Sequence, residues 1–217
     1  MASPLNVAVI VPVKSQSRRY KNKNFRSLNG EKLYQILLKK LSDCDFDQVW
    51  VDTDSNEVKE FSLSCGYQTI DRQPELAADS ANGNDLLNYH STIVETDIYF
   101  QLFVTAPFLK TETINSAIDI MKNNLHYDSI LTAEEIYSWF WFNGDPVNYE
   151  PSVLPRSQDA VPIVRESTGL YGIRSEALAK HSCRIGANPY FLYLDQIEAI
   201  DIDTELDFQI AELFHTD

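Results

Sequence analysis

The chain has 217 residues, 44% of them hydrophobic, which is enough for a single domain with a substantial core. A formal net charge of −14 argues against general binding to nucleic acids, whose backbones are polyanions. The three cysteines lie far apart and form no C-x-x-C pair, so we expect neither a disulfide framework nor a thiolate metal site. The apolar run at 7–13 is too short to span a bilayer, and we therefore expect a soluble, cytoplasmic protein without a membrane partner.

Strands and helices are predicted to alternate along the chain. Runs rich in Val, Ile and aromatic residues predict strands, and apolar residues at helical spacing predict helices. In chain order these are a strand at 6–13, a helix at 31–41, a strand at 47–54, a helix at 55–66, a strand at 67–70, a helix at 82–95, a strand at 97–104, a helix at 111–124 and a strand at 127–133. Ser55 and Thr111 are expected as helix caps, and Gly66 as a helix end. This alternation is typical of an α/β fold with a mostly parallel sheet and helices on both faces.

The segment KSQSRRYKNKNFR, at 14–26, holds six Lys or Arg and no Asp or Glu. Taken alone, a run of like charges is usually a solvated face. Here it directly follows a predicted strand, and ligands of parallel sheets bind beyond the carboxyl ends of the strands. The segment is therefore either a solvated surface or a site for small anions.

Two carboxylates stand out near the end of the chain. If 199–203 is a strand, Asp201 and Asp203 project from the same face. Thr204 and Asp207 resemble a capping box, so a helix is expected to begin directly afterwards. Paired oxygen ligands at such a position suit Mg²⁺. The alternative is that Asp203 only caps the helix and Asp201 is solvated.

The region 134–169 interrupts the alternation. It gathers four consecutive aromatic residues at 139–142 and then four prolines. Large aromatic side chains favour burial, so we expect an ordered excursion from a single domain spanning 1–217. A small satellite core is the simplest interpretation of these aromatic residues.

Five segments, taken in chain order, resemble a known family. They are VPVKSQSRRYKNKNFRSLNGEKL, VWVDTDSNEV, DRQPELAADSANG, TAPFLKTETINSAI and IDIDTELDFQIAE. The first resembles the N-terminal signature of the cytidylyltransferases that activate acidic sugars, the CMP-sialic acid (acylneuraminate) and CMP-Kdo synthetases. The last is similar to the metal-binding segment near the end of the acylneuraminate enzymes. The resemblance implies a Rossmann-like nucleotidyltransferase fold. It also implies transfer of CMP from CTP to a nonulosonic or Kdo-like acid, with release of pyrophosphate.

The same resemblance assigns roles to individual residues. Catalytic roles fall to the lysines and carboxylates at matching positions, Lys14, Lys23, Asp201 and Asp203, with Mg²⁺ held by the two aspartates. Nucleotide contacts are implied for Lys14, Ser15, Gln16, Ser17, Arg18, Lys23, Asn24, Arg72, Ala81, Asn82 and Gly83. Sugar contacts are implied for Phe103, Arg156 and Arg165, since a guanidinium suits a carboxylate. For Arg72 the alternative is a surface ion pair with a carboxylate such as Glu75.

In the sialic acid relatives the excursion crosses to a second subunit and helps close its active site, so the resemblance implies a homodimer. The chain also departs from the family pattern. Val13 and Lys14 stand where Ala-Arg is usual, the basic segment lacks glycine, and Phe103 or Val104 replaces a glutamine. The four histidines lie outside the matched motifs and are expected to serve packing or the surface.

Two other classes of function stay open. One is a nucleotidyltransferase for another base, or a glycosyltransferase that uses D-I-D as its metal motif. The other is a protein that binds nucleotide sugars without turnover. The identity of the sugar acid is not readable from these residues.

Overall fold

The computed structural model describes residues 4–16, 22–78, 80–153 and 155–214. The predicted contacts of Ser17 and Arg18 lie outside these ranges. Within them, no helix combines the length and the apolar character that a membrane crossing requires.

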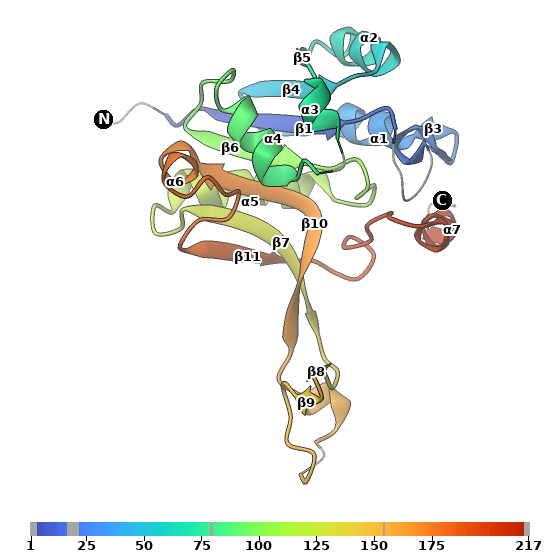
Figure 1. Ribbon diagram of the computed structural model, residues 1–217, viewed down its shortest axis with the longest axis vertical. Helices are drawn as coiled ribbons and strands as arrows, with labels where there is room; N and C mark the ends of the chain where they lie inside the picture. Colours follow the sequence, from blue (N-terminus) through green and yellow to red (C-terminus); the bar gives the residue numbers. More distant parts are fainter. Residues whose placement is uncertain (1–3, 17–21, 79, 154, 215–217) are drawn as a thin grey trace.

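A seven-stranded sheet, in the order β11-β7-β10-β6-β1-β4-β5, forms the centre of the body (Figure 1). Its strands are β1 (Val7–Val13), β4 (Gln48–Thr53), β5 (Gln68–Asp71), β6 (Ile98–Leu102), β7 (Ser129–Ile136), β10 (Ile163–Arg174) and β11 (Pro189–Tyr193). β10 pairs antiparallel with β6 and with β7, whereas the other pairings in this sheet are parallel. The prediction of a mostly parallel sheet is confirmed.

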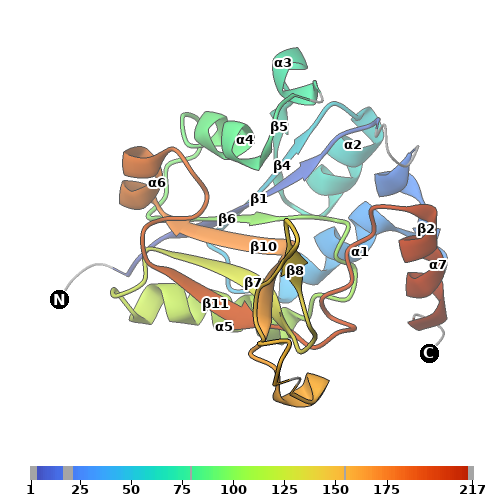
Figure 2. The ribbon, with the colours of Figure 1, turned by 60° about the horizontal axis from the view of Figure 1, so that its bottom comes forward.

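Helices cover both faces of this sheet (Figure 2). They are α1 (Leu33–Lys40), α2 (Asn56–Ser64), α3 (Pro74–Ala77), α4 (Gly83–His90), α5 (Thr111–Asn123), α6 (Ser175–His181) and α7 (Glu205–Phe214). Alternate residues of β1 reach the two faces: Val9 and Val11 pack in one cluster with α1, α2 and α5, and Ala8 and Ile10 in another with α4 and α6. Burial on both faces explains why β1 reads as an unbroken apolar run.

Short elements complete the body and the excursion. They are the 3₁₀ turns η1 (Lys23–Phe25), η2 (Leu41–Asp43) and η3 (Ser157–Asp159), and the two-residue strands β2 (Ser27–Leu28), β3 (Glu31–Lys32), β8 (Trp141–Phe142) and β9 (Asp145–Pro146).

Helix ends follow local chemistry at some positions and tertiary contacts at others. The Ser55 hydroxyl accepts a hydrogen bond from the amide of Val58 (3.4 Å), and Gly66 follows α2 with φ at +82°, so both predicted ends are confirmed. Thr111 as a cap is wrong: α5 begins at Thr111 itself and Lys110 is the N-cap residue. The amide of Lys110 is fixed by the Glu198 carboxylate (2.9 Å), which starts the helix one residue early.

The segment 199–203 is not a strand, although the prediction that Asp201 and Asp203 share one face assumed that it is. It runs past the loop that follows β6, and the Ile202 amide donates to the Thr105 carbonyl (2.8 Å). Because no neighbouring strand offers a ladder there, the backbone stays irregular. The alternation of side chains survives, since Ile202 is fully buried while Asp201 and Asp203 are partly exposed.

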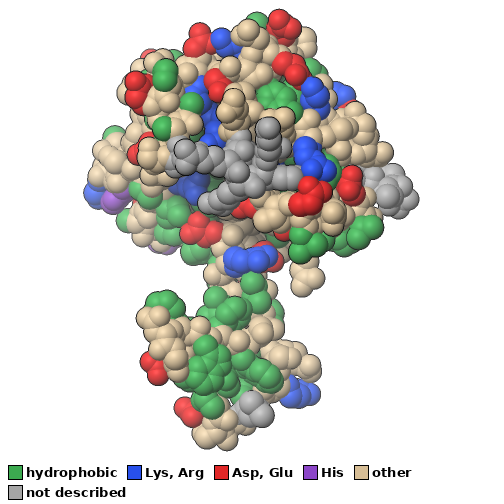
Figure 3. All heavy atoms as spheres, turned by 45° about the vertical axis from the view of Figure 1, so that its right-hand side comes forward, with side chains coloured by type: hydrophobic (Ala, Val, Ile, Leu, Met, Phe, Trp, Pro, Cys, Tyr) green, Lys and Arg blue, Asp and Glu red, His purple; other side chains and the backbone are tan. Residues whose placement is uncertain are grey.

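The excursion forms an arm, residues 134–166, in which β7 and β10 leave the sheet and support the β8–β9 hairpin (Figure 1). Asn143 and Gly144 both have positive φ, the signature of a tight hairpin turn. Hydrophobic side chains gather on the arm's surface (Figure 3), and Trp141 and Phe142 are 57% and 70% exposed. A satellite core that buries these aromatic residues is therefore absent from the described part of this chain.

β10 carries a register shift against β7 between Glu166 and Tyr171. In that gap the Thr132 hydroxyl donates to the Ser167 carbonyl (2.9 Å) and accepts from the Leu170 amide (3.3 Å). One side chain thus replaces the missing ladder bonds, and this irregular part of β10 brings Thr168 to the edge of the sheet where the parallel strands end.

Candidate active site

A pocket of about 340 Å³ opens at the carboxyl ends of the central parallel strands. The predicted residues that line it are Lys14, Lys23, Asn24, Arg72, Ala81, Asn82, Gly83, Phe103, Asp201 and Asp203. These residues come from segments far apart in the sequence. The fold therefore brings most of the predicted site together in one place.

The two ends of the basic segment are tied to each other and to β4. The Asn24 side chain donates to the Lys14 carbonyl (3.0 Å), which fixes the two lysine-bearing ends of the segment together. The amide and hydroxyl of Ser15 donate to the Asp54 carboxylate (2.6 and 2.7 Å). Ser15 thus holds the backbone, and neither it nor the exposed Gln16 is among the lining residues.

Asp201 and Asp203 have partners from two different parts of the chain. The Lys23 ammonium donates to Asp203 (2.7 Å), and the Thr168 hydroxyl donates to Oδ2 of Asp201 (2.5 Å). The other oxygen of Asp201, Oδ1, is buried and has no hydrogen-bond partner among the described residues. A buried carboxylate oxygen without a donor is the environment that a cation completes.

The helix cap next to these carboxylates is supplied by other residues. The Thr204 hydroxyl accepts from the Asp207 amide (3.3 Å), and the Asp207 carboxylate accepts from the Thr204 amide (2.7 Å). The predicted capping box is therefore confirmed, and Asp203 is not the cap. Burial by itself raises the pKa of Asp207, but hydrogen bonds from Thr204 and from the Asp203 amide outweigh burial and hold that pKa below its ordinary value.

The donor set fits Mg²⁺ better than a metal that needs a full protein cage. The described residues contain no group of three or more His, Cys, Asp or Glu arranged around a metal position. Mg²⁺ commonly takes one or two protein carboxylates and completes its shell with water and substrate phosphates. Asp201 and Asp203, with one orphaned oxygen, meet that requirement.

Arg72 is braced from behind by a buried network. Its Nε and Nη2 donate to one oxygen of Asp52 (3.0 and 2.8 Å), and Nε2 of His90 lies 2.9 Å from the same oxygen. All three side chains are at most 2% exposed. The alternative of a surface pair with Glu75 is wrong, because Arg72 points inward from the end of β5 and not along the surface.

The network determines the ionisation of Asp52. Burial alone raises the pKa of this carboxyl group. The hydrogen bonds from His90 and Arg72 outweigh burial and hold the pKa of Asp52 below its ordinary value. His90 was expected to serve packing or the surface; it is fully buried and serves packing behind Arg72.

The turn before α4 presents backbone to the pocket. The side-chain oxygen of Asn82 accepts from the amides of Asn84 (2.8 Å) and Asp85 (3.3 Å), and Asp85 accepts from the Asn82 amide in return. Asn82 is thus the N-cap of α4. Its side chain positions the turn, which leaves backbone groups of Ala81 to Gly83 to face a ligand.

Arg184 lines the same pocket and was missed by sequence reasoning. It lies in the loop after α6, in no matched motif, and its guanidinium stacks 3.5 Å from the ring centre of Tyr171. Phe103 packs edge-on against the same ring, at 6.4 Å between centroids. These contacts join the loop after α6 to β10 and to the residue that follows β6. Because they depend on packing between elements, no local sequence signal could have found Arg184.

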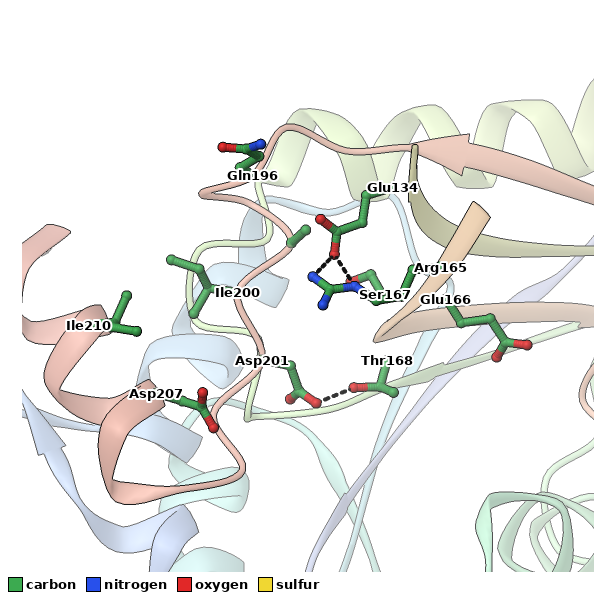
Figure 4. A pocket seen from close by; sticks show the side chains of 11 residues that line it. Glu134, Arg165, Glu166, Ser167, Thr168, Gln196, Ile200, Asp201, Asp207 and Ile210 are labelled. Carbon is green, nitrogen blue, oxygen red and sulfur yellow. Dashed lines mark hydrogen bonds and ion pairs between the residues drawn. The ribbon is translucent and has the colours of Figure 1, made fainter. Parts of the chain in front are cut away.

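The two arginines predicted for the sugar lie elsewhere. Arg165 forms an ion pair with Glu134 at the base of the arm, in a neighbouring pocket of about 300 Å³ that shares Thr168 and Asp201 with the first (Figure 4). Arg156 is on the arm, with a side chain 74% exposed and paired to Asp159 (2.6 Å). The described part of one chain does not bring Arg156 to either pocket.

Comparison with known proteins decides the family. A family model described as cytidylyltransferase matches residues 8–168, which is well over half of the chain. The chain belongs to the cytidylyltransferase family. Membership in this family leaves no support for the alternative of a glycosyltransferase.

Curated relatives of this cytidylyltransferase chain are distant in sequence. The N-acylneuraminate cytidylyltransferase A of Danio rerio is 24% identical over 95% of this chain and 50% of its own length. The post-translational flagellin modification protein B of Campylobacter coli is 25% identical over 90% of this chain and 89% of its own length. The chain thus spans about half the length of the N-acylneuraminate relatives it matches.

A solved structure agrees with the fold of this family member. The CMP:2-keto-3-deoxy-manno-octonic acid synthetase, solved with CTP, superposes with a TM-score of 0.72 at 17% identity, covering 96% of this chain and 98% of that one. At this identity the likeness establishes the fold alone.

Proposed function

We propose that this chain transfers CMP from CTP to a hydroxyl group of an acidic sugar, giving a CMP-sugar and pyrophosphate, with Mg²⁺ as cofactor. The observation that carries the proposal is the pocket of a cytidylyltransferase-family chain in which Lys14 and Lys23 face the Asp201–Asp203 pair. Cations for a triphosphate and carboxylates for a metal are the parts that phosphoryl transfer requires. Similarity to an N-acylneuraminate cytidylyltransferase and to a pseudaminic acid cytidylyltransferase supports an acidic sugar as acceptor.

The proposed reaction is an in-line substitution at the α-phosphorus of CTP. The sugar hydroxyl oxygen forms a bond to this phosphorus and its proton passes to water, while the bond to the bridging oxygen of the β-phosphate breaks and pyrophosphate leaves with the electron pair. Lys14 and Lys23 stabilise the negative charge that builds on the phosphates. Mg²⁺ on Asp201 and Asp203 would neutralise phosphate charge and lower the pKa of the attacking hydroxyl.

The nucleoside end is proposed to lie against Arg72 and the turn at 81–83. Nε and Nη2 of Arg72 donate hydrogen bonds to Asp52, and these bonds hold the guanidinium in one orientation. The short turn before α4 allows close approach of backbone donors and acceptors to a base edge. A rigid guanidinium beside fixed backbone groups favours one base over others.

A homodimer is proposed through the arm. Support comes from the exposed aromatic and aliphatic side chains of the arm, among them Trp141, Phe142 and Val153. An exposed apolar surface of this kind on a single chain marks an interaction site. A second copy would also bring Arg156 to a position that one chain cannot reach.

The test is pyrophosphate release with Mg²⁺, each of the four ribonucleoside triphosphates, and a panel of nonulosonic and Kdo-type acids. We expect release with CTP and one acid. The Asp203→Ala variant should lose turnover and keep its fold, because Asp203 is partly exposed and does not cap α7. Release with another triphosphate would contradict cytosine recognition. CTP binding without release for any acid would favour a non-catalytic nucleotide-binding protein.

A further inference from the structure

Most N–H donors of the Arg184 guanidinium have no hydrogen-bond acceptor among the described residues. Its guanidinium forms one long hydrogen bond, from Nη1 to the side-chain oxygen of Gln101 (3.4 Å). No carboxylate pairs with it in the described part of the chain. By contrast, Arg72, Arg156 and Arg165 each pair with an Asp or Glu. Arg184 is thus the arginine of the pocket whose charge is not compensated by the described residues.

The guanidinium is held rigidly although it lacks an ionic partner. It lies 3.5 Å from the ring centre of Tyr171 and 5.7 Å from that of Phe103, so two aromatic rings fix its position. Burial raises the pKa of Tyr171, and the ring beneath the cation therefore stays neutral. A guanidinium oriented by stacking, with free donors, is suited to a planar two-oxygen anion.

Gly83 makes room for this arrangement. A Cβ atom at this position would lie 2.4 Å from Nη1 of Arg184 and 3.1 Å from the side-chain oxygen of Gln101. Any larger residue would push the guanidinium away. The glycine predicted for nucleotide contact therefore also serves to seat Arg184.

The strand order separates the ends of the pocket. Arg72 follows β5 and Lys14 follows β1, whereas Phe103 follows β6 and the ring under Arg184 belongs to β10. If the nucleoside lies at Arg72 and the phosphates at the lysines, the part of the pocket toward β6 and β10 is left for the second substrate. Arg184 supplies the positive charge of that part.

We propose that Arg184 binds the carboxylate of the acidic sugar and so selects acidic over neutral acceptors. The inference rests on the proposed transfer reaction and adds the residue that recognises the acid. A phosphate of CTP is the other anion in reach, and the experiment separates these two sources.

The experiment compares wild type, Arg184→Ala, Arg184→Lys and Gly83→Ala in steady-state pyrophosphate release, with CTP and with the acid that wild type turns over. We expect Arg184→Ala to raise KM for the acid by about tenfold or more, with KM for CTP nearly unchanged. Arg184→Lys should recover part of the loss, because it keeps charge without the fork. Lys180→Ala removes a nearby exposed cation of α6 and should match wild type.

A second arm uses the methyl ester of the same acid as a competitive inhibitor. The ester lacks the carboxylate charge, so its inhibition constant should be the same for wild type and for Arg184→Ala, whereas KM for the free acid should differ between them. CTP affinity, measured by calorimetry without any acid, should not differ between the two proteins. A matching loss of CTP affinity would assign Arg184 to a phosphate and overturn the inference.

The outcomes distinguish this inference from the proposed reaction. Turnover by wild type with an unchanged acid KM in Arg184→Ala contradicts the role of Arg184 and leaves the reaction intact. Silence of folded wild type with every acid contradicts the reaction, and the inference with it. Thermal melting of each variant shows whether it is folded before its kinetics are interpreted.

Discussion

Two ion pairs hold charged side chains of the pocket, and these two pairs differ in how deeply they are buried. Lys23 and Asp203 form an ion pair in which the carboxylate is 44% exposed, so water screens it. Arg72 and Asp52 form an ion pair with almost no exposure. Removing one member should therefore cost little stability in the first case and a great deal in the second.

Asp52→Asn should strongly destabilise the protein. It leaves the Arg72 guanidinium buried without its counter-charge and puts a neutral amide in place of the carboxylate that contacts His90. Breaking a buried ion pair typically costs about 3–5 kcal/mol. Urea denaturation followed by circular dichroism measures the change, and Asp54→Asn, at an exposed carboxylate two residues away, is the comparison. Equal midpoints for the two variants would contradict the stabilising role of the network.

The same network predicts how stability responds to acid. Because the pKa of Asp52 is lower in the folded state than its ordinary value of 3.8, this carboxylate stabilises the fold fully above pH 3.8. The contribution should be lost as the pH falls below 3.8 through the lowered value. Unfolding free energies of wild type and Asp52→Asn should therefore converge as the pH drops, and a constant difference down to pH 2 would refute this.

At the scale of elements, the irregular stretch of β10 depends on one hydroxyl. Thr132 completes the bonds that the register shift leaves open, at Ser167 and Leu170. This places Thr168 where it donates to Asp201. The position of a proposed metal ligand is thus connected to a buried side chain on the neighbouring strand.

Thr132→Val should test this connection. Valine has nearly the same shape, but it leaves a buried carbonyl and amide without partners, which costs about 1–3 kcal/mol. We expect lower thermal stability together with a higher Mg²⁺ requirement for turnover. Thr132→Ser, which keeps the hydroxyl, should restore both properties. A valine variant with wild-type Mg²⁺ dependence would separate Thr132 from the site.

Elements were predictable where the determining interactions are local. β1 follows from a run of β-branched residues, and the starts of α2 and α7 follow from Ser55 and from Thr204 with Asp207, which lie within three residues of their partners. The segment 199–203 was not predictable as irregular, because strand formation depends on whether a neighbouring strand is present. Thr111 failed as a cap because Glu198, far along the chain, sets the start of α5.

The candidate site divides in the same way. Its lysines and aspartates occur in motif segments, and their convergence follows from the parallel sheet. The network that holds Arg72 joins Asp52 to Arg72 and to His90, which lie 20 and 38 positions further along the chain. Arg184 is held in the pocket by aromatic rings that belong to other elements. Contacts of this kind depend on packing between elements, which periodicity and spacing do not report.

At the scale of the whole molecule, the arm is the feature that one chain does not explain. Its apolar side chains face outward, and its two strands continue into the sheet beside the pocket. An extended arm with such a surface is stable in water chiefly when another surface covers it. The body, by contrast, has a buried apolar core on each face of its sheet.

Replacing Trp141 and Phe142 with Glu should convert the proposed dimer into a monomer. Two charges at these exposed positions oppose burial against a partner without disturbing the body of the chain. Analytical ultracentrifugation across a range of protein concentrations measures the change. Leu125→Glu adds a charge at an exposed position outside the arm and should leave the dimer intact. A wild-type protein that sediments as a monomer at every concentration would contradict the proposal.

The pocket's cations lie in a molecule that is otherwise acidic, and this affects the kinetics of substrate capture. CTP and an acidic sugar are both anions, and they approach a chain of formal net charge −14 before they reach Lys14, Lys23 or Arg184. Added salt weakens that long-range repulsion, since the Debye length is only about 8 Å at physiological ionic strength. It also weakens the attraction inside the pocket. Encounters should become more frequent as salt is added, while each bound anion dissociates sooner.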